Sequence, residues 1–518
     1  MNDKVVSKKS RTWLTLRRVS QLVFLALFFF LFLKAEFVDQ ETLAWPVDLF
    51  FRFDPLALAT HLLTFGPLVA KLFWSLVFVG LTFLLGRFFC GWVCPMGTTL
   101  DGSRRLLFSP RPDRGVAARW RRVKYYLLLA LLVSSLLSVN LLGLFDPLSL
   151  LYRTLAIVLY PVFGYGVEHA ALTLYKIGPP VTYVSEPVYQ FFKATLLPFR
   201  PLVYLLPFLT LTLFALVVAA ERVDRRFWCR ALCPLGALYG LMARFSLLRR
   251  RPAALCPDCG DCTDRCKMGT FAPGKPARHQ NAECQLCMRC LAECEKGKGE
   301  FTWRSKAPRA SLDLGRRQLI TAVVAGVAVT PMLRLGSLAR RPDEHLIRPP
   351  GAQNEADFLS RCIRCGQCMK VCLTNGLQPV LWEAGLEGFY TPRLVPRMGY
   401  CNYSCQLCSQ VCPTGAIPQL ELPVKQATNL GVAFINRSRC IPYTEASDCL
   451  VCEEHCPVSP KAIVFNEQEV INFQGERVKV KLPVVNPDRC NGCGHCENVC
   501  PVGGEAAIRV KRSLRVEM

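Results

Sequence analysis

Long apolar stretches separated by charged segments run through the first half of the chain. The four longest are Val19–Leu33, Gly66–Gly86, Tyr125–Phe145 and Pro201–Ala220. The last three reach the ~20 residues that a helix needs to cross a bilayer. The first is shorter, but Arg18 and Lys34 at its ends can snorkel to the membrane surface. Four such stretches favour spans over buried core helices, so we predict an α-helical membrane domain of four spans over residues 1–252.

The two halves of this predicted domain share a sequence pattern. Phe-Asp-Pro-Leu occurs at residues 53–56 and again at 145–148, each time before a short apolar segment. These segments, Pro55–Phe65 and Thr154–Tyr165, are too short to span a bilayer, so we expect them to be re-entrant or interfacial. The pattern predicts two tandem repeats, related by an axis along the membrane normal.

The distribution of charge predicts an orientation. The chain has a formal net charge of +24, and its basic residues precede the first apolar stretch and follow the second and fourth. The loop after the first stretch is acidic instead, with Glu36, Asp39, Glu41, Asp48 and Asp54. This asymmetry follows the positive-inside rule and predicts a cytoplasmic N-terminus. Because no basic patch interleaved with aromatic residues occurs elsewhere, we do not expect nucleic-acid binding.

The 28 cysteines fall into patterns without remainder. Most of them form six runs with the spacing C-x2-C-x2-C-x3-C, or with a longer first gap. The runs are Cys256, Cys259, Cys262 and Cys266; Cys284, Cys287, Cys290 and Cys294; Cys362, Cys365, Cys368 and Cys372; Cys401, Cys405, Cys408 and Cys412; Cys440, Cys449, Cys452 and Cys456; and Cys490, Cys493, Cys496 and Cys500.

This spacing is typical of bacterial ferredoxins, in which three cysteines of a run bind one [4Fe–4S] cluster and the fourth binds a neighbouring cluster. Disulfides within such tight runs would be strained, and zinc ribbons use two separated C-x2-C pairs. We predict six [4Fe–4S] clusters in small α+β ferredoxin-like domains, two clusters in residues 253–310 and four in 341–518. The sequence contains no C-x-x-C-H motif, so we expect no c-type haem.

Ferredoxin architecture also implies how the runs pair. In the first two runs, the fourth cysteine of each would complete the cluster of the other. For the last four runs we expect a nested arrangement, in which the two outer runs pair and the two inner runs pair. Cys500 would then join the run that begins at Cys362, and Cys456 the run that begins at Cys401.

The four remaining cysteines lie in two C-x3-C-P motifs, Cys90 with Cys94 and Cys229 with Cys233. The expected duplication would bring these thiols together at the cytoplasmic edge of the membrane. Three roles are open: a seventh cluster, redox-active dithiols, or packing alone. A total of 28 cysteines, which is seven sets of four, favours the cluster.

A fifth apolar stretch, Gln318–Leu333, follows Arg316 and Arg317 between the two predicted ferredoxin domains. A twin arginine ahead of a weakly hydrophobic segment resembles a twin-arginine export signal, which would carry a folded cluster domain across the membrane. An ordinary fifth span is the alternative. Either interpretation makes residues 311–340 a signal or anchor and places the residues that follow on the outer side. Whether the segment is cleaved stays open.

Two known families share these motifs. Residues 1–300 resemble membrane ferredoxins of the NapH/MauN type, on the predicted spans, the C-x3-C-P motifs and the two runs that follow. Residues 311–518 resemble exported four-cluster ferredoxins of the NapG/MauM type, on Arg316-Arg317, Arg-Pro-Pro-Gly-Ala at 348–352, and the cysteine runs. The chain therefore resembles a fusion of the two types.

The resemblance implies a quinol dehydrogenase component in the bacterial inner membrane, with its last four clusters in the periplasm. It would pass electrons from menaquinol or another quinol of the quinone pool to a periplasmic reductase or a multihaem cytochrome, as in anaerobic respiration. Ionisable groups at membrane depth often mark function. Such candidates for the quinol site are Asp54, His61, Asp146, Glu168 and His169. Asp54 and Asp146 are equally expected to cap the helices that follow them.

Two other functions fit the same residues. One is a quinone-independent conduit that takes electrons from a cytoplasmic donor to the periplasm. The other is a reductase for metal or cofactor maturation, because C-x3-C-P motifs with two ferredoxin runs also occur in membrane proteins that resemble copper reductases. The outer four-cluster domain favours sustained electron transfer over maturation. The sequence leaves open whether the chain is an enzyme or an electron carrier.

Overall fold

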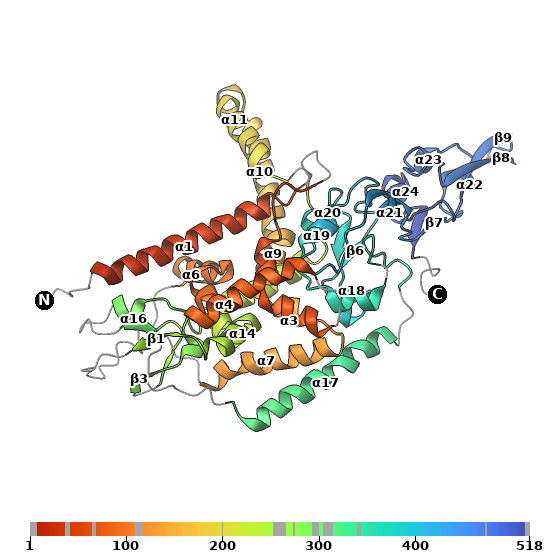
Figure 1. Cartoon of the computed structure of the whole chain (residues 1–518). Coiled ribbons are helices and arrows are strands. Elements are labelled where there is room, and N and C mark those ends of the chain that lie inside the picture. The colour runs from red at the N-terminus through yellow and green to blue at the C-terminus, as the bar shows by residue number, and fades with distance from the viewer. Residues whose placement is uncertain are drawn as a thin grey trace. The chain divides into compact units, whose positions relative to one another are not determined.

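The computed structural model (Figure 1) describes most of the chain. The described residues are 8–36, 42–64, 69–108, 118–198, 200–251, 266–272, 275–292, 300–303, 314–338, 343–352, 354–471 and 474–512. The chain forms two compact units. The first comprises Met1–Phe32, Val47–Tyr152 and Leu211–Pro331, and the second comprises Leu33–Pro46, Arg153–Thr210 and Met332–Met518. Two segments of the predicted membrane domain, residues 33–46 and 153–210, therefore cluster with the last ferredoxin region.

Helices dominate the first unit. They are α1 (Lys8–Leu33), α2 (Leu49–Arg52), α3 (Pro55–Leu63), η1 (Ala70–Trp74), α4 (Ser75–Leu85), α5 (Phe88–Trp92), α6 (Pro95–Leu107), α7 (Ala118–Leu136), α8 (Leu142–Phe145), α12 (Pro207–Ala220), α13 (Phe227–Ala231), α14 (Pro234–Ala243), η3 (Asn281–Glu283) and α16 (Arg289–Ala292). Two small antiparallel sheets accompany them, β1 (Leu248–Arg251) with β4 (Glu300–Trp303) and β2 (Phe271–Ala272) with β3 (Lys275–His279).

The second unit combines helices with short strands. Its helices are η2 (Leu155–Leu159), α10 (Tyr160–Tyr175), α11 (Pro179–Thr195), α18 (Glu355–Arg361), α19 (Gln367–Lys370), η4 (Leu386–Gly388), α20 (Leu407–Gln410), α21 (Leu422–Ala427), α22 (Ile441–Thr444), α23 (Val451–Glu454) and α24 (His495–Val499). Two further helices, α9 (Pro147–Thr154) and α17 (Arg316–Leu338), pass from one unit into the other, as does α12, whose residues up to Thr210 belong to the second unit.

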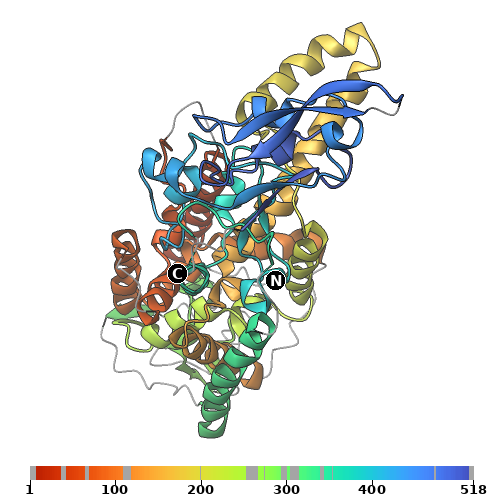
Figure 2. The same ribbon diagram turned by 90° about the vertical axis from the view of Figure 1, so that its right-hand side faces the viewer.

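Three antiparallel strand pairs organise the cysteine runs of the second unit. The pairs are β5 (Leu377–Pro379) with β6 (Pro392–Leu394), β7 (Val432–Ile435) with β10 (Ile508–Lys511), and β8 (Ile463–Ile471) with β9 (Arg477–Val485). The last pair is a long hairpin in the register Ile463↔Val485 to Ile471↔Arg477, seen at the upper right of Figure 2. This mixture of short helices and strand pairs fits the predicted α+β ferredoxin-like class.

Two helices of the described chain are long and apolar enough to cross a membrane, Thr12–Leu33 and Pro147–Tyr175. A bent pair, Ala70–Leu85 with Phe88–Leu107, would add a third if it forms one broken span. The helix Pro207–Ala220 is apolar but shorter. The first predicted span is thus a helix of the expected kind, whereas the number four stays a prediction.

One sequence-based expectation is wrong. The segment Thr154–Tyr165, expected to be too short to span, lies inside the continuous 29-residue helix Pro147–Tyr175. The π-helical turn η2 ends two residues before Pro161, and a π-turn relieves the clash of a proline ring with the preceding turn of helix. The helix therefore continues past a proline that would otherwise end or kink it.

The two Phe-Asp-Pro turns have the same local structure. The Asp54 carboxylate accepts a hydrogen bond from the Leu56 N–H at 2.9 Å, and that of Asp146 accepts one from the Ser149 N–H at 2.6 Å. Proline follows each aspartate at the first helical position, where its missing N–H is harmless. Both aspartates therefore cap the helices that follow, as expected.

Helix α17 packs along α7 (Figure 1). Ala322, Gly326 and Thr330 form its buried face, with a spacing of four residues. A Cβ at Gly326 would lie 2.8 Å from the Ala130 carbonyl oxygen, so only glycine allows this approach. Small residues at such spacing are typical of helix contacts in membranes.

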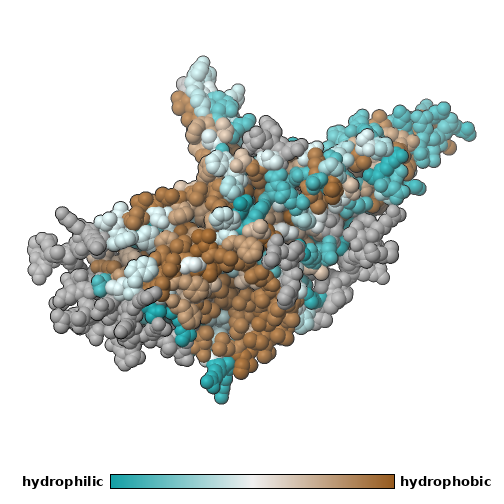
Figure 3. Space-filling model, viewed as in Figure 1, coloured by the Kyte–Doolittle hydropathy of each residue, from teal (hydrophilic) through white to brown (hydrophobic). Residues whose placement is uncertain are grey.

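Large apolar side chains of α17 and α4 face outward, over a broadly apolar face of the protein (Figure 3). Val323, Val324 and Val327 of α17 are exposed, as are Leu76 and Val77 of α4. An apolar surface of this kind is typical of contact with lipid or with another protein. The protein is therefore membrane-associated or exported, as its apolar helices suggest.

Candidate metal centres

The described residues include 24 of the 28 cysteines, and none of these 24 forms a disulfide. Cys256, Cys259, Cys262 and Cys294 lie outside the described residues, so their predicted pairing stays a prediction. In the same described ranges, no three His, Cys, Asp or Glu side chains lie close enough to bind a single metal ion. The cysteines gather in wider quartets around cavities instead.

In the second unit, each quartet takes three cysteines from one run and the fourth from another. Three of these quartets line separate cavities: Cys401, Cys405 and Cys408 with Cys372; Cys440, Cys449 and Cys452 with Cys500; and Cys490, Cys493 and Cys496 with Cys456. In the fourth, Cys412 lies close enough to Cys362, Cys365 and Cys368 for its charge to add to the effect of burial and raise the pKa of each of these thiols.

The nested pairing expected from the sequence is therefore wrong. Consecutive runs exchange their fourth cysteines instead, so that Cys412, and not Cys500, lies beside the run of Cys362. The strand pairs give the reason. The β5–β6 pair folds the third run back on the fourth, and the β8–β9 hairpin joins the fifth run to the sixth. Closing a short loop costs less chain entropy than nesting runs more than a hundred residues apart.

Several thiols of these quartets are poorer acids than an ordinary cysteine. Burial raises the pKa of Cys440 and Cys401 to about 11 and that of Cys493 to about 12. Neighbouring thiols raise these values further. Iron binding would replace the protons, because the thiolate is the ligand. Four convergent thiols around an apolar cavity are the donor set that a [4Fe–4S] cluster needs, so the residues fit this group.

The first unit contains a further ferredoxin-type quartet. Cys266 lies within electrostatic range of Cys284 and Cys290, and Cys287 is close to both. The Thr270 N–H also points at the Cys266 sulfur, at 3.4 Å. This grouping agrees with the crosswise pairing expected for the first two runs.

The four C-x3-C-P cysteines also come together. Burial and the nearby charges of Cys90 and Cys229 raise the pKa of Cys94. The pKa of Cys233 is likewise raised by burial and by all three of the other cysteines. Prolines after Cys94 and Cys233 begin α6 and α14, which places these two cysteines at helix N-termini. Burial raises the pKa of Cys229 to about 12. The convergence expected from the repeat is therefore present in the structure.

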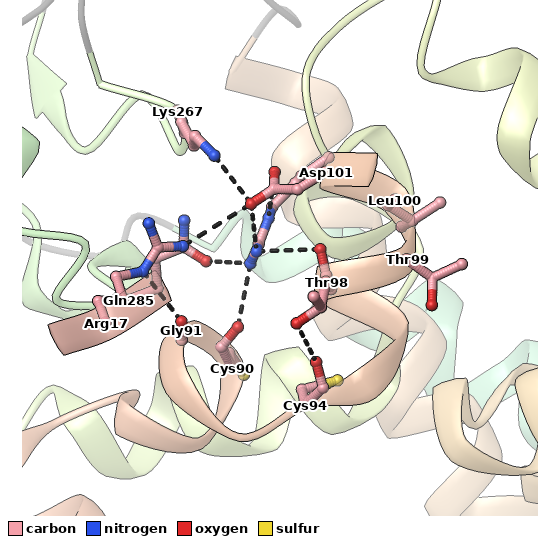
Figure 4. A network of polar contacts seen from close by, with 12 residues as sticks. Arg17, Cys90, Gly91, Cys94, Thr98, Thr99, Leu100, Asp101, Lys267 and Gln285 are labelled. Atoms are coloured by element: carbon pink, nitrogen blue, oxygen red, sulfur yellow. Dashed lines mark hydrogen bonds and ion pairs between the residues drawn. The ribbon is translucent and has the colours of Figure 1, made fainter. Parts of the chain in front are cut away.

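Two buried arginines attach this four-thiol site to the adjoining ferredoxin run. The Arg226 guanidinium donates to the Cys90 and Gly97 carbonyl oxygens at 3.0 and 3.1 Å, and also to the Gln285 side chain. Figure 4 shows Cys90, Gln285, Asp101 and Lys267 of this network. It is held by Asp101 at 2.9 Å, which in turn accepts from Lys267 at 2.8 Å.

Arg87 makes the matching contact on the other side of the site. Its guanidinium donates to the Glu283 carboxylate at 3.1 Å, and Glu283 also accepts from Tyr125 at 2.7 Å and from Lys124. Glu283 and Gln285 flank Cys284. Sequence reasoning missed these polar partners, although each arginine stands three residues before the first cysteine of its motif. That repetition was the available signal.

Two of the quinol-site candidates meet in the first unit. Asp54 and Asp146 are each 1% exposed and lie close enough for their charges to interact. Two buried carboxylates near each other repel, which favours a proton on one of them. The phenol of Tyr239, also buried, lies within electrostatic range of both aspartates and of Cys90. The structure thus places a carboxyl pair near the four-thiol site.

The remaining candidates lie apart from this pair. His61 is buried on α3. Glu168 is half-buried on α10 and lines a cavity of about 190 Å³ in the second unit, together with Tyr165, Tyr189 and Lys193. His169 follows it on α10 but is exposed.

Comparison with known proteins agrees with these centres. Residues 361–416 match a "4Fe-4S dicluster domain", and residues 482–508 match a "4Fe-4S binding domain". A second "4Fe-4S binding domain" model matches twice, at 68–114 and 206–252, around the two C-x3-C-P motifs. The dicluster match covers the third and fourth runs together, in line with their exchange of cysteines. The chain is thus an iron–sulfur protein of the ferredoxin type.

Similar proteins of known name identify the family to which the chain belongs. The methylamine utilization ferredoxin-type protein MauM of Paracoccus denitrificans is 36% identical over 200 residues, which are 38% of this chain and 82% of MauM. The ferredoxin-type protein NapG of Escherichia coli is 36% identical over 202 residues, 38% of this chain and 85% of NapG. The chain belongs to this family of MauM and NapG ferredoxin-type proteins. No solved structure matches it.

Proposed function

We propose that the chain is a membrane-bound electron-transfer protein that oxidises menaquinol or a similar quinol and delivers the electrons to a periplasmic reductase or multihaem cytochrome. The crosswise cysteine quartets carry this proposal, because they are built to hold several clusters close together. Six [4Fe–4S] clusters, one for each run, would supply one-electron transfer when bound. The protein supplies their thiolates and the surrounding hydrogen bonds.

We further propose that residues 1–300 correspond to a NapH/MauN-type membrane component, fused to the MauM- and NapG-like region. The two matches around the C-x3-C-P motifs support this assignment. In the proposed topology, four spans place the N-terminus and residues 253–310 in the cytoplasm of a bacterial cell and residues 341–518 in the periplasm. The distribution of basic residues in the sequence supports this orientation.

The cavity beside Glu168 is the proposed quinol site. Quinol oxidation releases protons, and a carboxylate that lines the cavity can accept one. Tyr165, Tyr189 and Lys193 add hydroxyl and ammonium groups that can orient the quinol oxygens. The Asp54–Asp146 pair is the alternative proton acceptor.

The test is reduction of the anaerobically purified full chain by menaquinol, followed through the visible spectrum of the clusters. We expect reduction, and a rate about 10²-fold lower in Glu168→Gln, the low end of what a general base contributes. Reduction of this variant by dithionite should be unchanged. His169→Gln is the matched control, because His169 is exposed beside the cavity. Menaquinol that fails to reduce the wild-type clusters refutes the proposal.

A quinone-independent conduit is the second candidate. The contacts of Arg87 and Arg226 with Glu283 and Gln285 favour it, because they join the membrane domain to a run predicted to face the cytoplasm. Rapid reduction of the same sample by a reduced cytoplasmic ferredoxin, without any response to menaquinol, would support the conduit.

A further inference from the structure

The four C-x3-C-P thiols are enclosed by cations in a reciprocal arrangement. Arg87 lies within electrostatic range of Cys90 from its own motif and Cys233 from the other. Arg226 likewise lies within range of Cys229 from its own motif and Cys94 from the other. Each arginine therefore stands between the two motifs, and both are almost fully buried, at 0% and 1% exposure.

Two glycines make room for these arginines. A Cβ at Gly236 would lie 2.8 Å from Nη2 of Arg87 and 3.4 Å from the Cys233 sulfur. A Cβ at Gly97 would lie 3.1 Å from Nη1 of Arg226. Both glycines stand three residues after the second cysteine of a motif. The C-x3-C-P-x-G sequence thus shapes each half of the site to admit the arginine of the other half.

Positive charge around the site exceeds the negative charge of its carboxylates. Five cationic side chains join the network, and all are at least nine-tenths buried: Arg17, Arg87, Lys124, Arg226 and Lys267. The carboxylates that face them are Asp101, Glu221 and Glu283. A site lined with this excess of buried positive charge suits an anionic group better than a neutral one.

Arg87 also keeps hydrogen-bonding capacity unused. Its Nε and Nη2 atoms are buried and have no hydrogen-bond partner among the described residues. Nη2 and the Cys233 sulfur both lie near Gly236, at 2.8 and 3.4 Å from the position that a Cβ would take there. Unused buried guanidinium donors are unusual for a site that only packs, because such donors are normally satisfied. They suit a site that receives an anionic group.

We propose that Cys90, Cys94, Cys229 and Cys233 together bind an additional iron–sulfur cluster, with Arg87 and Arg226 as its charge partners. Each motif supplies two thiolates, so neither half can hold a four-iron cluster alone. The cluster with its four thiolates is anionic, which compensates the excess positive charge. The site would adjoin the run of Cys284, because the Trp92 indole donates to the Leu286 carbonyl oxygen at 3.1 Å. This inference does not depend on quinol as the electron donor.

The proposal is tested by measuring how much iron and acid-labile sulfide the anaerobically purified full chain contains. We expect about 28 iron atoms per chain, one for each cysteine. Cys90→Ser and Cys229→Ser should each lower the count by about four. The double variant should lose no more than either single variant, because both residues bind one cluster.

A matched control separates loss of the site from misfolding. Cys90→Ser combined with Cys440→Ser should lose about eight irons, since these cysteines serve different clusters. The paramagnetic spectra of the other clusters should persist in Cys90→Ser. Arg87→Lys should retain the iron but shift the reduction potential of one cluster, because lysine lacks the guanidinium donors.

Three results would overturn the proposal. One is an iron count that stays the same in Cys90→Ser and Cys229→Ser. Another is zinc in place of iron at this site, by metal analysis. The third is a Cys90–Cys94 or Cys229–Cys233 disulfide in wild-type protein after alkylation and mass spectrometry, which would identify redox-active dithiols. None of these results requires quinol, so they leave the proposed function to its own test.

Discussion

Glu283 is the side chain whose loss should destabilise the protein most directly. It is 2% exposed and faces both Arg87 and Lys124, which are completely buried. Glu283→Ala would leave two buried cations without their counterion. We expect a loss of about 3–5 kcal/mol, seen as a lower melting temperature of the protein in detergent. Glu467→Ala, at an exposed position of β8, should change little. Equal melting temperatures for the two variants would contradict this account of Glu283.

The carboxyl pair predicts a proton that spectroscopy can detect. Because Asp54 and Asp146 are both buried and their charges interact, we expect one of them to carry a proton. We expect an infrared band of a protonated carboxylic acid that disappears in Asp54→Asn and in Asp146→Asn. Asp48→Asn is the control, since buried Asp48 pairs with Arg52 at 2.5 Å and its substitution should leave the band unchanged. A band that survives both of the first two substitutions would refute the shared proton.

The contacts of these buried charged side chains were only partly predictable from the sequence. The sequence indicated that Asp54 and Asp146 cap helices, because a cap is a local interaction. Their mutual interaction joins residues more than 90 positions apart. The contacts of Arg87 and Arg226 also join distant parts of the sequence, since their partners Glu283 and Gln285 belong to the ferredoxin run. No periodicity in one segment reports such contacts.

The exchange of cysteines between consecutive runs leads to a test by double substitution. Cys440→Ser and Cys500→Ser should each remove about four irons, and together no more, because both line one cavity. The nested pairing would instead predict a loss of about eight irons in the double variant. Cys362→Ser with Cys500→Ser is the control in which the losses should add.

Helix α17 should remain as an anchor. Its face of Ala322, Gly326 and Thr330 is buried, in part against α7, and a cleaved signal has no need of such a fit. We expect membranes to contain the full-length chain. Gly326→Leu should lower its melting temperature, because the side chain would collide with Ala130 and Val133. Val327→Leu, at an exposed position, should have little effect. Recovery of residues after 340 as a separate soluble fragment would contradict the anchor.

The elements show where hydrophobic patterns succeed and fail. The apolar stretch at Val19–Leu33 is part of the long helix α1, as its composition predicted. The segment Thr154–Tyr165 instead belongs to a longer helix, because Glu168 and His169 interrupt the apolar run without ending the helix. A hydropathy pattern detects the end of an apolar stretch, whereas backbone hydrogen bonding determines the end of a helix.

Across the chain, the proposed topology predicts which parts are accessible from each side of the membrane. An epitope tag after Met518 should be accessible to antibody in intact spheroplasts, and a tag before Met1 should be accessible only after lysis. This follows from the basic residues beside the predicted cytoplasmic ends. Access to both tags in intact spheroplasts would exclude the proposed orientation, with an internal cytoplasmic protein as the control for lysis.

The sequence by itself determined the class of cofactor, because a run such as Cys362–Cys372 encodes cluster binding in local spacing. It also indicated that Cys90, Cys94, Cys229 and Cys233 would meet, since repetition along the chain implies repetition in space. Only the tertiary structure decided that Cys412 completes the run of Cys362 and that two buried arginines enclose the four-thiol site. Such contacts depend on how strand pairs and helices bring distant segments together, and local spacing carries no information about that.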